Sequence, residues 1–132
     1  MKWASQDKKK KKYSIKRFFK SFKYAFTGIL KAYGSEQNLL VHTIVAIIVL
    51  VTGYFLQLSR IEFCIIVLMI GVVLALEMVN TAIEYTVDMA MPNIHPLAKI
   101  AKDVAGGAVL LVCFTAIIIG IIIFLPKIIS LF

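Results

Sequence analysis

Three long apolar stretches dominate this sequence of 132 residues and limit what it can fold into. The first, 39–56, contains no charged side chain. A helix of that length covers about 27 Å, close to the thickness of a bilayer's hydrocarbon core. The second stretch is expected at 63–90 and the third at 104–125. Because 61% of the residues are hydrophobic, against roughly 45–50% in soluble domains, the chain is predicted to be a small all-α integral membrane protein.

Positive charge is concentrated before the first span. Eleven of the 15 Lys and Arg residues lie within residues 1–38, and the net charge of the chain is +8. Lys and Arg flank membrane spans on the cytoplasmic side, so the N-terminus, with its Lys-rich segment 1–13, is predicted to be cytoplasmic. Three spans then place the C-terminus outside and the connection 91–103 inside. Nucleic-acid binding is disfavoured, because the adjoining spans make membrane orientation the simpler explanation of the lysines.

Residues 14–34 show a pattern typical of a helix that lies flat on a membrane. Apolar residues recur at intervals of three and four, and the lysines lie mostly elsewhere on the helix. The apolar positions are Ile15, Phe18, Phe19, Phe22, Phe26, Ile29 and Leu30. Gly34 and Ser35 are expected to end this amphipathic surface helix before the first span begins.

The second span carries a stripe of polar residues on one face. Its members fall within about 80° of arc on an α-helix: Glu77, Asn80, Glu84 and Asp88. Each acid near the bilayer centre costs up to about 2.5–3.5 kcal/mol, so the stripe is expected to face protein or water. Carboxylates on one face suit a divalent cation or proton abstraction. The alternative is an assembly seam, in which the stripe packs against His42, Lys102 or a neighbouring subunit.

Further polar positions lie near the ends of the spans. Lys102 and Asp103 come directly before the third span, where a lysine and the free N–H groups of a helix start suit phosphate oxygens. Alternatively, Lys102 follows the positive-inside tendency and Asp103 caps the helix. Glu36 stands before the first span and His95 lies in the 91–103 connection. Taken alone, both are typical of solvated surface side chains.

Two motifs give the sequence a resemblance to a known family. The segment 77–84, Glu-Met-Val-Asn-Thr-Ala-Ile-Glu, and the run 95–110 resemble the signatures of the small prokaryotic diacylglycerol kinases. The resemblance covers about residues 14–127. It implies a homotrimer of three-span subunits, each with an amphipathic surface helix. It also implies transfer of the ATP γ-phosphate to a lipid alcohol at the cytoplasmic face of a bacterial plasma membrane.

The same resemblance implies roles for individual residues. Glu77 is expected to be the general base that takes the proton of the lipid hydroxyl. Glu84 and Glu36 are expected to hold Mg²⁺ on the phosphates, and Asn80 to orient the reacting groups. Nucleotide contacts are expected from Lys102 and Asp103 and, less closely matched to the family, from Arg17, Tyr24, Asn93, Ile94 and His95.

A similarity to one branch of the family predicts the lipid acceptor. Residues 35–60 and 91–110 are most similar to the Gram-positive branch of the family, which is associated with undecaprenol, the lipid carrier of cell-wall synthesis. Undecaprenol is therefore the expected acceptor and diacylglycerol the alternative. Ser35 before Glu36 departs from the family pattern and bears on lipid specificity. A hypothesis from another class is a non-enzymatic transport or assembly subunit, whose acidic stripe would carry protons or cations.

Overall fold

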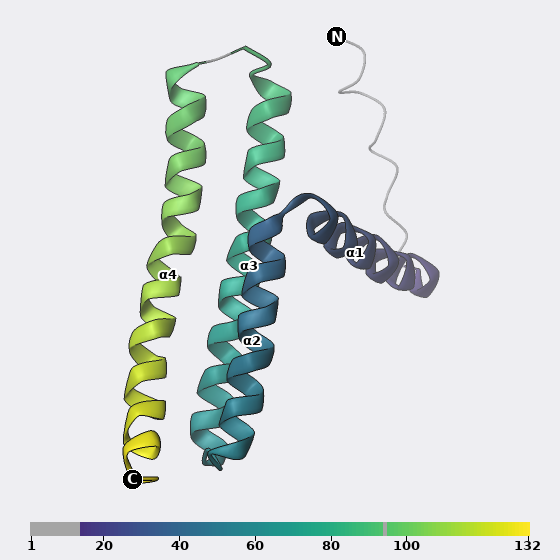
Figure 1. Cartoon of the computed structure of the whole chain (residues 1–132). Coiled ribbons are helices and arrows are strands. Elements are labelled where there is room, and N and C mark those ends of the chain that lie inside the picture. The colour runs from purple at the N-terminus through teal and green to yellow at the C-terminus, as the bar shows by residue number, and fades with distance from the viewer. Residues whose placement is uncertain (1–13, 94) are drawn as a thin grey trace. The chain divides into compact units, whose positions relative to one another are not determined.

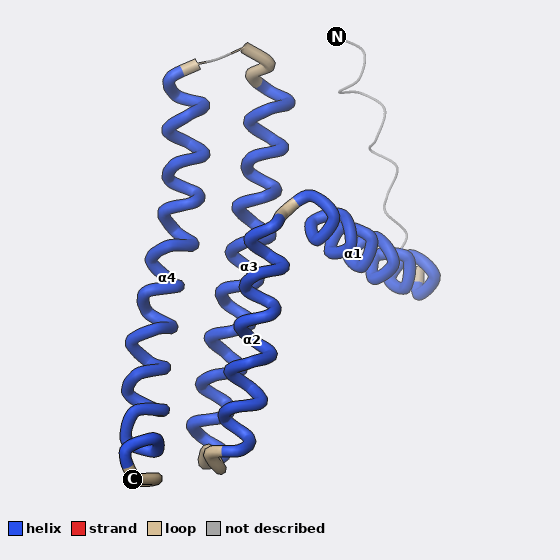
Figure 2. Tube along the Cα trace, viewed as in Figure 1, coloured by secondary structure: helices blue, strands red, loops and turns tan. Residues whose placement is uncertain are grey.

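The secondary structure is helical throughout the part of the chain that the computed structural model describes, residues 14–93 and 95–132. Its elements are α1 (Ile15–Ser35), α2 (Gln37–Phe55), α3 (Arg60–Ala90) and α4 (Pro96–Ile129), shown in Figure 1 and, coloured by secondary structure, in Figure 2. The chain divides into two units, residues 1–31 and 32–132. The Lys-rich segment 1–13 lies outside the described residues.

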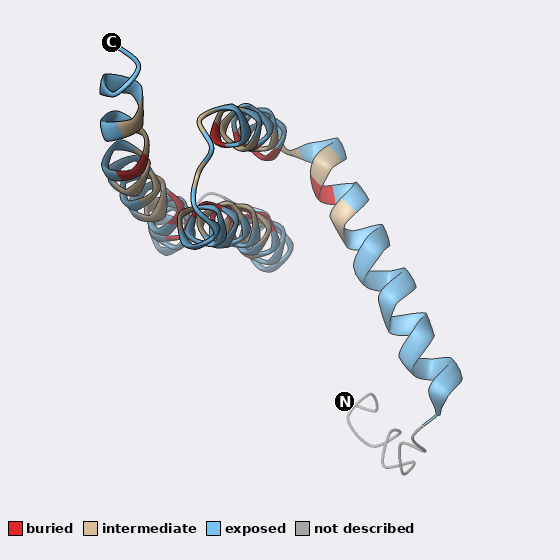
Figure 3. Cartoon of the chain, turned by 90° about the horizontal axis from the view of Figure 1, so that it is seen from below, coloured by how far each residue is buried: buried red, intermediate tan, exposed pale blue. Residues whose placement is uncertain are grey.

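The helix predicted over 14–34 is present as α1. Its residues up to Lys31 belong to the first unit, and nearly all of their side chains are exposed (Figure 3). The last turn belongs to the second unit. There Ala32 is buried, and the Tyr33 hydroxyl lies 2.6 Å from Oγ1 of Thr43 in α2.

Helices α2, α3 and α4 lie side by side along most of the length of α2 (Figure 1). The closest packing is between α3 and α4, and α3 also packs against α2. All three are long and apolar enough to cross a membrane, and each coincides with one of the predicted spans. Figure 1 also shows that α3 and α4 continue past the start of α2 toward their connection, and that the C-terminus lies at the opposite end.

The reversal between α2 and α3 is specified locally. Ser59 is the N-cap of α3: its hydroxyl accepts from the Glu62 N–H at 3.3 Å, and the Glu62 carboxylate accepts from the Ser59 N–H at 2.7 Å. This is a capping box. Before it, Gln57 takes a left-handed φ of 51°. The Leu58 N–H donates to the Gly53 carbonyl at 3.1 Å, which closes α2 in a Schellman motif.

The N-terminus of α4 lies earlier than the sequence predicts. The helix begins at Pro96, because a proline at the first helical position loses no helical hydrogen bond. His95 caps it, with Nδ1 accepting from the Leu97 N–H at 3.2 Å. The expectation that Lys102 and Asp103 stand at a helix start is therefore wrong. Both lie inside α4, where the backbone N–H groups are engaged in helical hydrogen bonds.

The C-terminus of α4 also differs from the prediction. The sequence predicts an end at residue 125, before Pro126, yet the helix continues to Ile129. A proline removes one backbone donor and disturbs the preceding turn. Because Pro126 lies near the end of α4, few further helical hydrogen bonds depend on that turn, and the helix can continue past it. An ion pair also joins the end of α4 to the first turn of α3, since Lys127 Nζ lies 3.2 Å from Glu62 Oε2.

Few apolar side chains of the described chain are buried. They come mostly from α2, α3 and α4: Ala32, Leu39, Ala46, Ile66, Val73, Ala105, Val109 and Ile123. Most large apolar side chains of these helices are exposed instead (Figure 3). Such a surface is suited to lipid or to other protein chains.

Candidate functional site

The polar stripe of α3 is buried at one end and exposed at the other. Glu77 is 4% exposed, Asn80 9% and Thr81 3%. Glu84 is half-buried, and Asp88 is exposed. The Thr81 hydroxyl donates to the Glu77 carbonyl at 3.0 Å, so it is satisfied within the helix. The stripe therefore offers one carboxylate sheltered by protein and two that are more accessible.

Glu77 lies at a distance from the start of α3 that is close to the thickness of a hydrocarbon core. It lies 17 residues after Arg60, the first residue of the helix, or about 26 Å along the axis at 1.5 Å per residue. A hydrocarbon core is about 30 Å thick. Glu84 and Asp88 lie about two and three turns further along, in the part of α3 that extends toward the connection with α4. Measured from Arg60, the stripe thus begins just within that thickness and extends beyond it.

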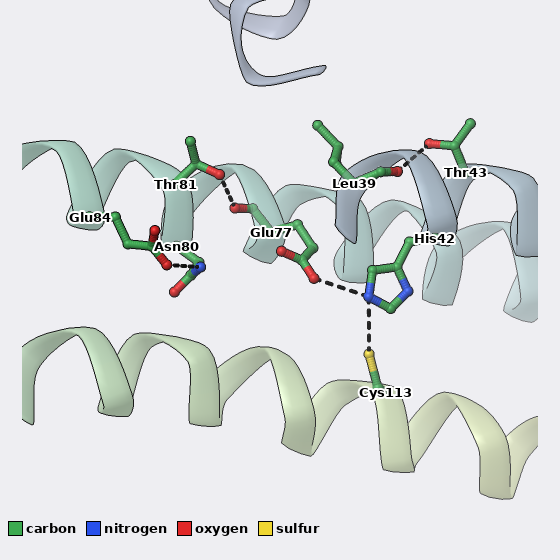
Figure 4. A network of polar contacts seen from close by, with 8 residues as sticks. All are labelled: Leu39, His42, Thr43, Glu77, Asn80, Thr81, Glu84 and Cys113. Carbon is green, nitrogen blue, oxygen red and sulfur yellow. Dashed lines mark hydrogen bonds and ion pairs between the residues drawn. The ribbon is translucent and has the colours of Figure 1, made fainter. Parts of the chain in front are cut away.

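Glu77 is held by a residue from another helix. Nε2 of His42, in α2, lies 3.0 Å from Oε1 of Glu77, and Sγ of Cys113, in α4, lies 4.0 Å from the same nitrogen. Figure 4 shows the His42 ring reaching from α2 toward both side chains. The contact between the stripe and His42, which the sequence offers as part of an assembly seam, is present. Helical spacing predicts that Thr81 lies one turn after Glu77 on α3. Nothing in the sequence predicts that Cys113 of α4 lies near this carboxylate.

Asn80 and Glu84 form a second pair on the stripe. Nδ2 of Asn80 donates to Oε1 of Glu84 at 2.9 Å (Figure 4). Oδ1 of Asn80 is buried, and no partner for it exists among the described residues. Leaving such an oxygen without a donor or cation costs about 1–3 kcal/mol. The pair therefore presents an oxygen that a bound ligand or a neighbouring chain could satisfy.

The exposed end of the site consists of two ion pairs. Lys102 Nζ of α4 pairs with Oδ1 of Asp88 of α3, so the second contact offered for the stripe is also present. Lys99 Nζ lies 2.5 Å from Oδ2 of Asp103, one turn away on α4. Both pairs lie near the connection between the two helices. Lys102, Asp88 and Asp103 are thus gathered at the same end of the bundle as Glu84.

The remaining predicted site residues lie in different parts of the chain. Glu36 is the N-cap of α2, is half-buried, and makes no side-chain capping bond. Asn93 is exposed in the connection before α4, and His95 caps that helix. Arg17 and Tyr24 are exposed in the first unit. Ile94 lies outside the described residues.

The described ranges contain no group of three or more His, Cys, Asp or Glu side chains arranged to hold a metal ion. A site with two protein carboxylates, such as the predicted ligands Glu36 and Glu84, is smaller than such a group. The donors themselves suit Mg²⁺, since a carboxylate and an amide oxygen are hard oxygen ligands. Mg²⁺ is typically held by one or two carboxylates together with substrate phosphates. Glu84 with the unpartnered Oδ1 of Asn80 fits that requirement.

An apolar cavity of about 380 Å³ is lined by His42, the partner of Glu77. It lies between α2, α3 and α4, and its polar lining side chains are His42 and Cys113. From them it extends along the helices to Ile66 and Phe124. Gly120 lines it, and a Cβ added there would meet nothing within 4 Å. The volume is in the range of about 300–1,000 Å³ for small-molecule sites.

Comparison with known proteins identifies the family. The sequence model of prokaryotic diacylglycerol kinase matches residues 23–124. The chain belongs to the prokaryotic diacylglycerol kinase family. It is therefore a lipid kinase with several membrane-spanning helices, and the polar stripe of α3 lies within the matched region. The hypothesis of a non-enzymatic transport or assembly subunit is not supported.

Individual relatives differ in their named substrate. The chain is 47% identical over 121 residues to the undecaprenol kinase of Bacillus subtilis, with 92% of this chain and 98% of that protein covered. It is 39% identical over 112 residues to a diacylglycerol kinase of Synechocystis sp., with 84% and 64% covered. With the diacylglycerol kinase of Escherichia coli K12 it shares 26% identity over 102 residues, with 77% and 84% covered.

Proposed function

We propose that this chain transfers the γ-phosphate of ATP to the hydroxyl of undecaprenol, giving undecaprenyl phosphate. The observation that carries the proposal is the position of Glu77, a buried carboxylate whose partner His42 also lines an apolar cavity. A lipid alcohol needs both a base for its hydroxyl and an apolar space for its chain. The 47% identity to a protein named undecaprenol kinase supports this acceptor over diacylglycerol.

The enzyme is proposed to sit in a bacterial plasma membrane with its active site toward the cytoplasm. The N-terminal segment and the α3–α4 connection would face the cytoplasm, with the C-terminus outside and α1 on the membrane surface. Eleven of 15 Lys and Arg residues lie in residues 1–38, and Lys99 and Lys102 lie near the α3–α4 connection. At the other end, Lys127 pairs with Glu62. This charge distribution fits the positive-inside tendency.

The working unit is proposed to be a homotrimer. One subunit has three thin spans with few buried side chains, and it cannot by itself enclose ATP and a lipid. Oδ1 of Asn80 is buried without a partner in the described chain. Association of subunits would cover exposed apolar residues and complete sites that a single chain leaves open.

The reaction needs mainly alignment and charge neutralisation. Glu77 takes the proton of the lipid hydroxyl as that oxygen forms a bond to the γ-phosphorus. The bond between the γ-phosphorus and its bridging oxygen breaks, and ADP leaves with the electron pair. Asn80 orients the reacting groups, and Lys102 neutralises charge on the phosphates. Further nucleotide contacts are proposed for Asp103, Arg17, Tyr24, Asn93, Ile94 and His95.

Mg²⁺ is proposed to be held by Glu84 and Glu36. When bound, it neutralises negative charge on the phosphates. Glu84 is fixed by the amide of Asn80, which keeps its carboxylate on the same face of α3 as Glu77. Glu36 makes no capping bond to α2, so its carboxylate is not committed to the helix end.

The proposal is tested by phosphate transfer from labelled ATP in detergent micelles with Mg²⁺. Undecaprenol and diacylglycerol are compared side by side, with Glu77→Gln as the control. Label in undecaprenol that is lost in the variant is the expected result. Label mainly in diacylglycerol would keep the mechanism and change the substrate. No label in either lipid from a folded wild-type protein would refute the proposed function.

A further inference from the structure

His42 is a polar residue near the start of the apolar helix α2, and the proposed reaction gives it no role. Its side chain is 28% exposed, whereas that of Glu77 is 5% exposed. The two are joined by the 3.0 Å contact between Nε2 and Oε1. A buried carboxylate is costly unless it is hydrogen-bonded. The contact therefore couples the orientation of the catalytic carboxylate to a residue on a different helix.

The geometry determines which atoms take part. A carboxylate only accepts hydrogen bonds, so the histidine nitrogen that faces ionised Glu77 must carry a proton. That nitrogen is Nε2, and in the neutral ring Nδ1 is then the unprotonated one. An N–H bond from Nε2 to Oε1 of Glu77 leaves the second carboxylate oxygen, Oε2, to accept a proton from another group.

We propose that His42 is a positioning residue, which holds the Glu77 carboxylate in the orientation that accepts the proton of the lipid alcohol. The inference rests on the proposed function, because it assigns Glu77 as the base. His42 also lines the apolar cavity, so it stands where the hydroxyl end of a lipid in that cavity would meet Glu77. The same side chain thus borders the acceptor and orients the base.

The competing explanation is purely structural. In that case His42 would stabilise the packing of α2 on α3 and have no effect through Glu77. The two explanations differ in what happens when Glu77 is already replaced. A residue that acts through Glu77 has nothing left to position in a Glu77→Gln protein, whereas a packing residue retains its full effect. Such a double-mutant cycle isolates the coupling between two residues.

The experiment measures kcat and KM for undecaprenol and for ATP in His42→Leu, His42→Gln, Glu77→Gln and the double variant His42→Leu/Glu77→Gln. His42→Leu is expected to lower kcat about 10- to 100-fold, because misplacing a reacting group by about 1 Å can cost that much. KM for ATP should stay within about twofold. His42→Gln retains an N–H donor at similar reach and should recover most of kcat. Cys64→Ala is the control, since this exposed cysteine of α3 does not line the cavity, and it should leave kcat within about twofold.

The outcomes separate the explanations. In single-turnover assays at high enzyme concentration, equal residual rates in Glu77→Gln and the double variant support positioning, and a further 10-fold loss in the double variant overturns it. An unchanged kcat in His42→Leu overturns it as well. Should His42→Leu fail to assemble, His42→Asn and His42→Gln decide, since the shorter amide should be at least tenfold slower. Failure of the wild type to phosphorylate any lipid would instead refute the proposed function.

Discussion

The ion pair between Asp88 and Lys102 gives a prediction about ATP affinity. Lys102 is proposed to contact the phosphates, yet in the described chain it is already paired with Asp88. To bind a phosphate through Nζ, it has to give up all or part of that pair. Asp88→Asn removes the competing charge and keeps the size of the side chain. We therefore expect this substitution to tighten ATP binding.

The size of the effect follows from the exposure of the pair. The side chains of Lys102 and Asp88 are 35% and 63% exposed, and exposed ion pairs contribute about 0.2–1 kcal/mol. If the wild type loses that free energy when ATP binds, Asp88→Asn avoids the loss. The substitution should therefore lower the dissociation constant of ATP by about 1.4- to 5-fold. The free energy of unfolding should fall by no more than about 1 kcal/mol.

The assay is calorimetric titration with a non-hydrolysable ATP analogue in micelles at two salt concentrations. Lys102→Gln serves as the background for a second measurement. If the effect acts through Lys102, Asp88→Asn should change nothing in that background. Higher salt should reduce the difference between Asp88→Asn and the wild type, since screening weakens the exposed pair. Equal or weaker ATP binding by Asp88→Asn at low salt would refute the reasoning.

Four further expectations follow from the helix ends, the cavity and the acidic stripe. Ser59→Ala should lower the free energy of unfolding by about 1 kcal/mol without changing kcat, and an unchanged thermal midpoint in detergent would contradict the role of the capping box. Gln57→Gly should raise stability by about 1 kcal/mol, because the left-handed φ of 51° costs a non-glycine residue that much; a lower midpoint would argue against it. Gly120→Leu should raise KM for undecaprenol about tenfold, because the new side chain fills part of the cavity and each CH₂ group of the lipid that is no longer buried costs roughly 0.8 kcal/mol. Gly71→Leu, outside the cavity lining, should leave this KM unchanged. Glu84→Gln should raise the Mg²⁺ concentration for half-maximal activity about tenfold, and an unchanged requirement would exclude it as a ligand.

The sequence predicts a helix well where hydrophobic periodicity or the length of an apolar stretch determines whether one forms. The surface-type pattern of 14–34 and the apolar stretches correspond to α1–α4. The largest error concerns the start of α4. The sequence pattern places Pro96 in the connection 91–103, whereas proline suits the first position of a helix and α4 begins there. Because of this error, Lys102 and Asp103 are predicted to stand at a helix start. The pair of Lys102 with Asp88 depends on the register between α4 and α3. The pair of Asp103 with Lys99 lies within α4 and depends on the orientation of the two side chains.

The candidate site is predictable on α3 and less so between helices. The stripe from Glu77 to Asp88 follows from helical spacing alone, because all of its members lie on one element. The sequence could name His42 only as one of several partners for the stripe. The contact of Cys113 with His42 carries no spacing signal, since 71 residues separate the two along the chain. The proposed homotrimer would bring together groups from different chains, and helical spacing within one chain carries no signal for such contacts.

The unequal lengths of the helices give membrane thickness a means of setting the rate. With 19 residues, α2 covers about 28 Å and matches a hydrocarbon core, whereas α3 with 31 residues is about 46 Å long. The shorter helix resists being moved out of register with the bilayer, while the longer ones tolerate it. In a thicker membrane Glu77 would lie farther below the surface, away from a nucleotide in water. In a thinner one it would meet the interface, so the lipid composition around the enzyme would tune phosphorylation without any dedicated regulatory site.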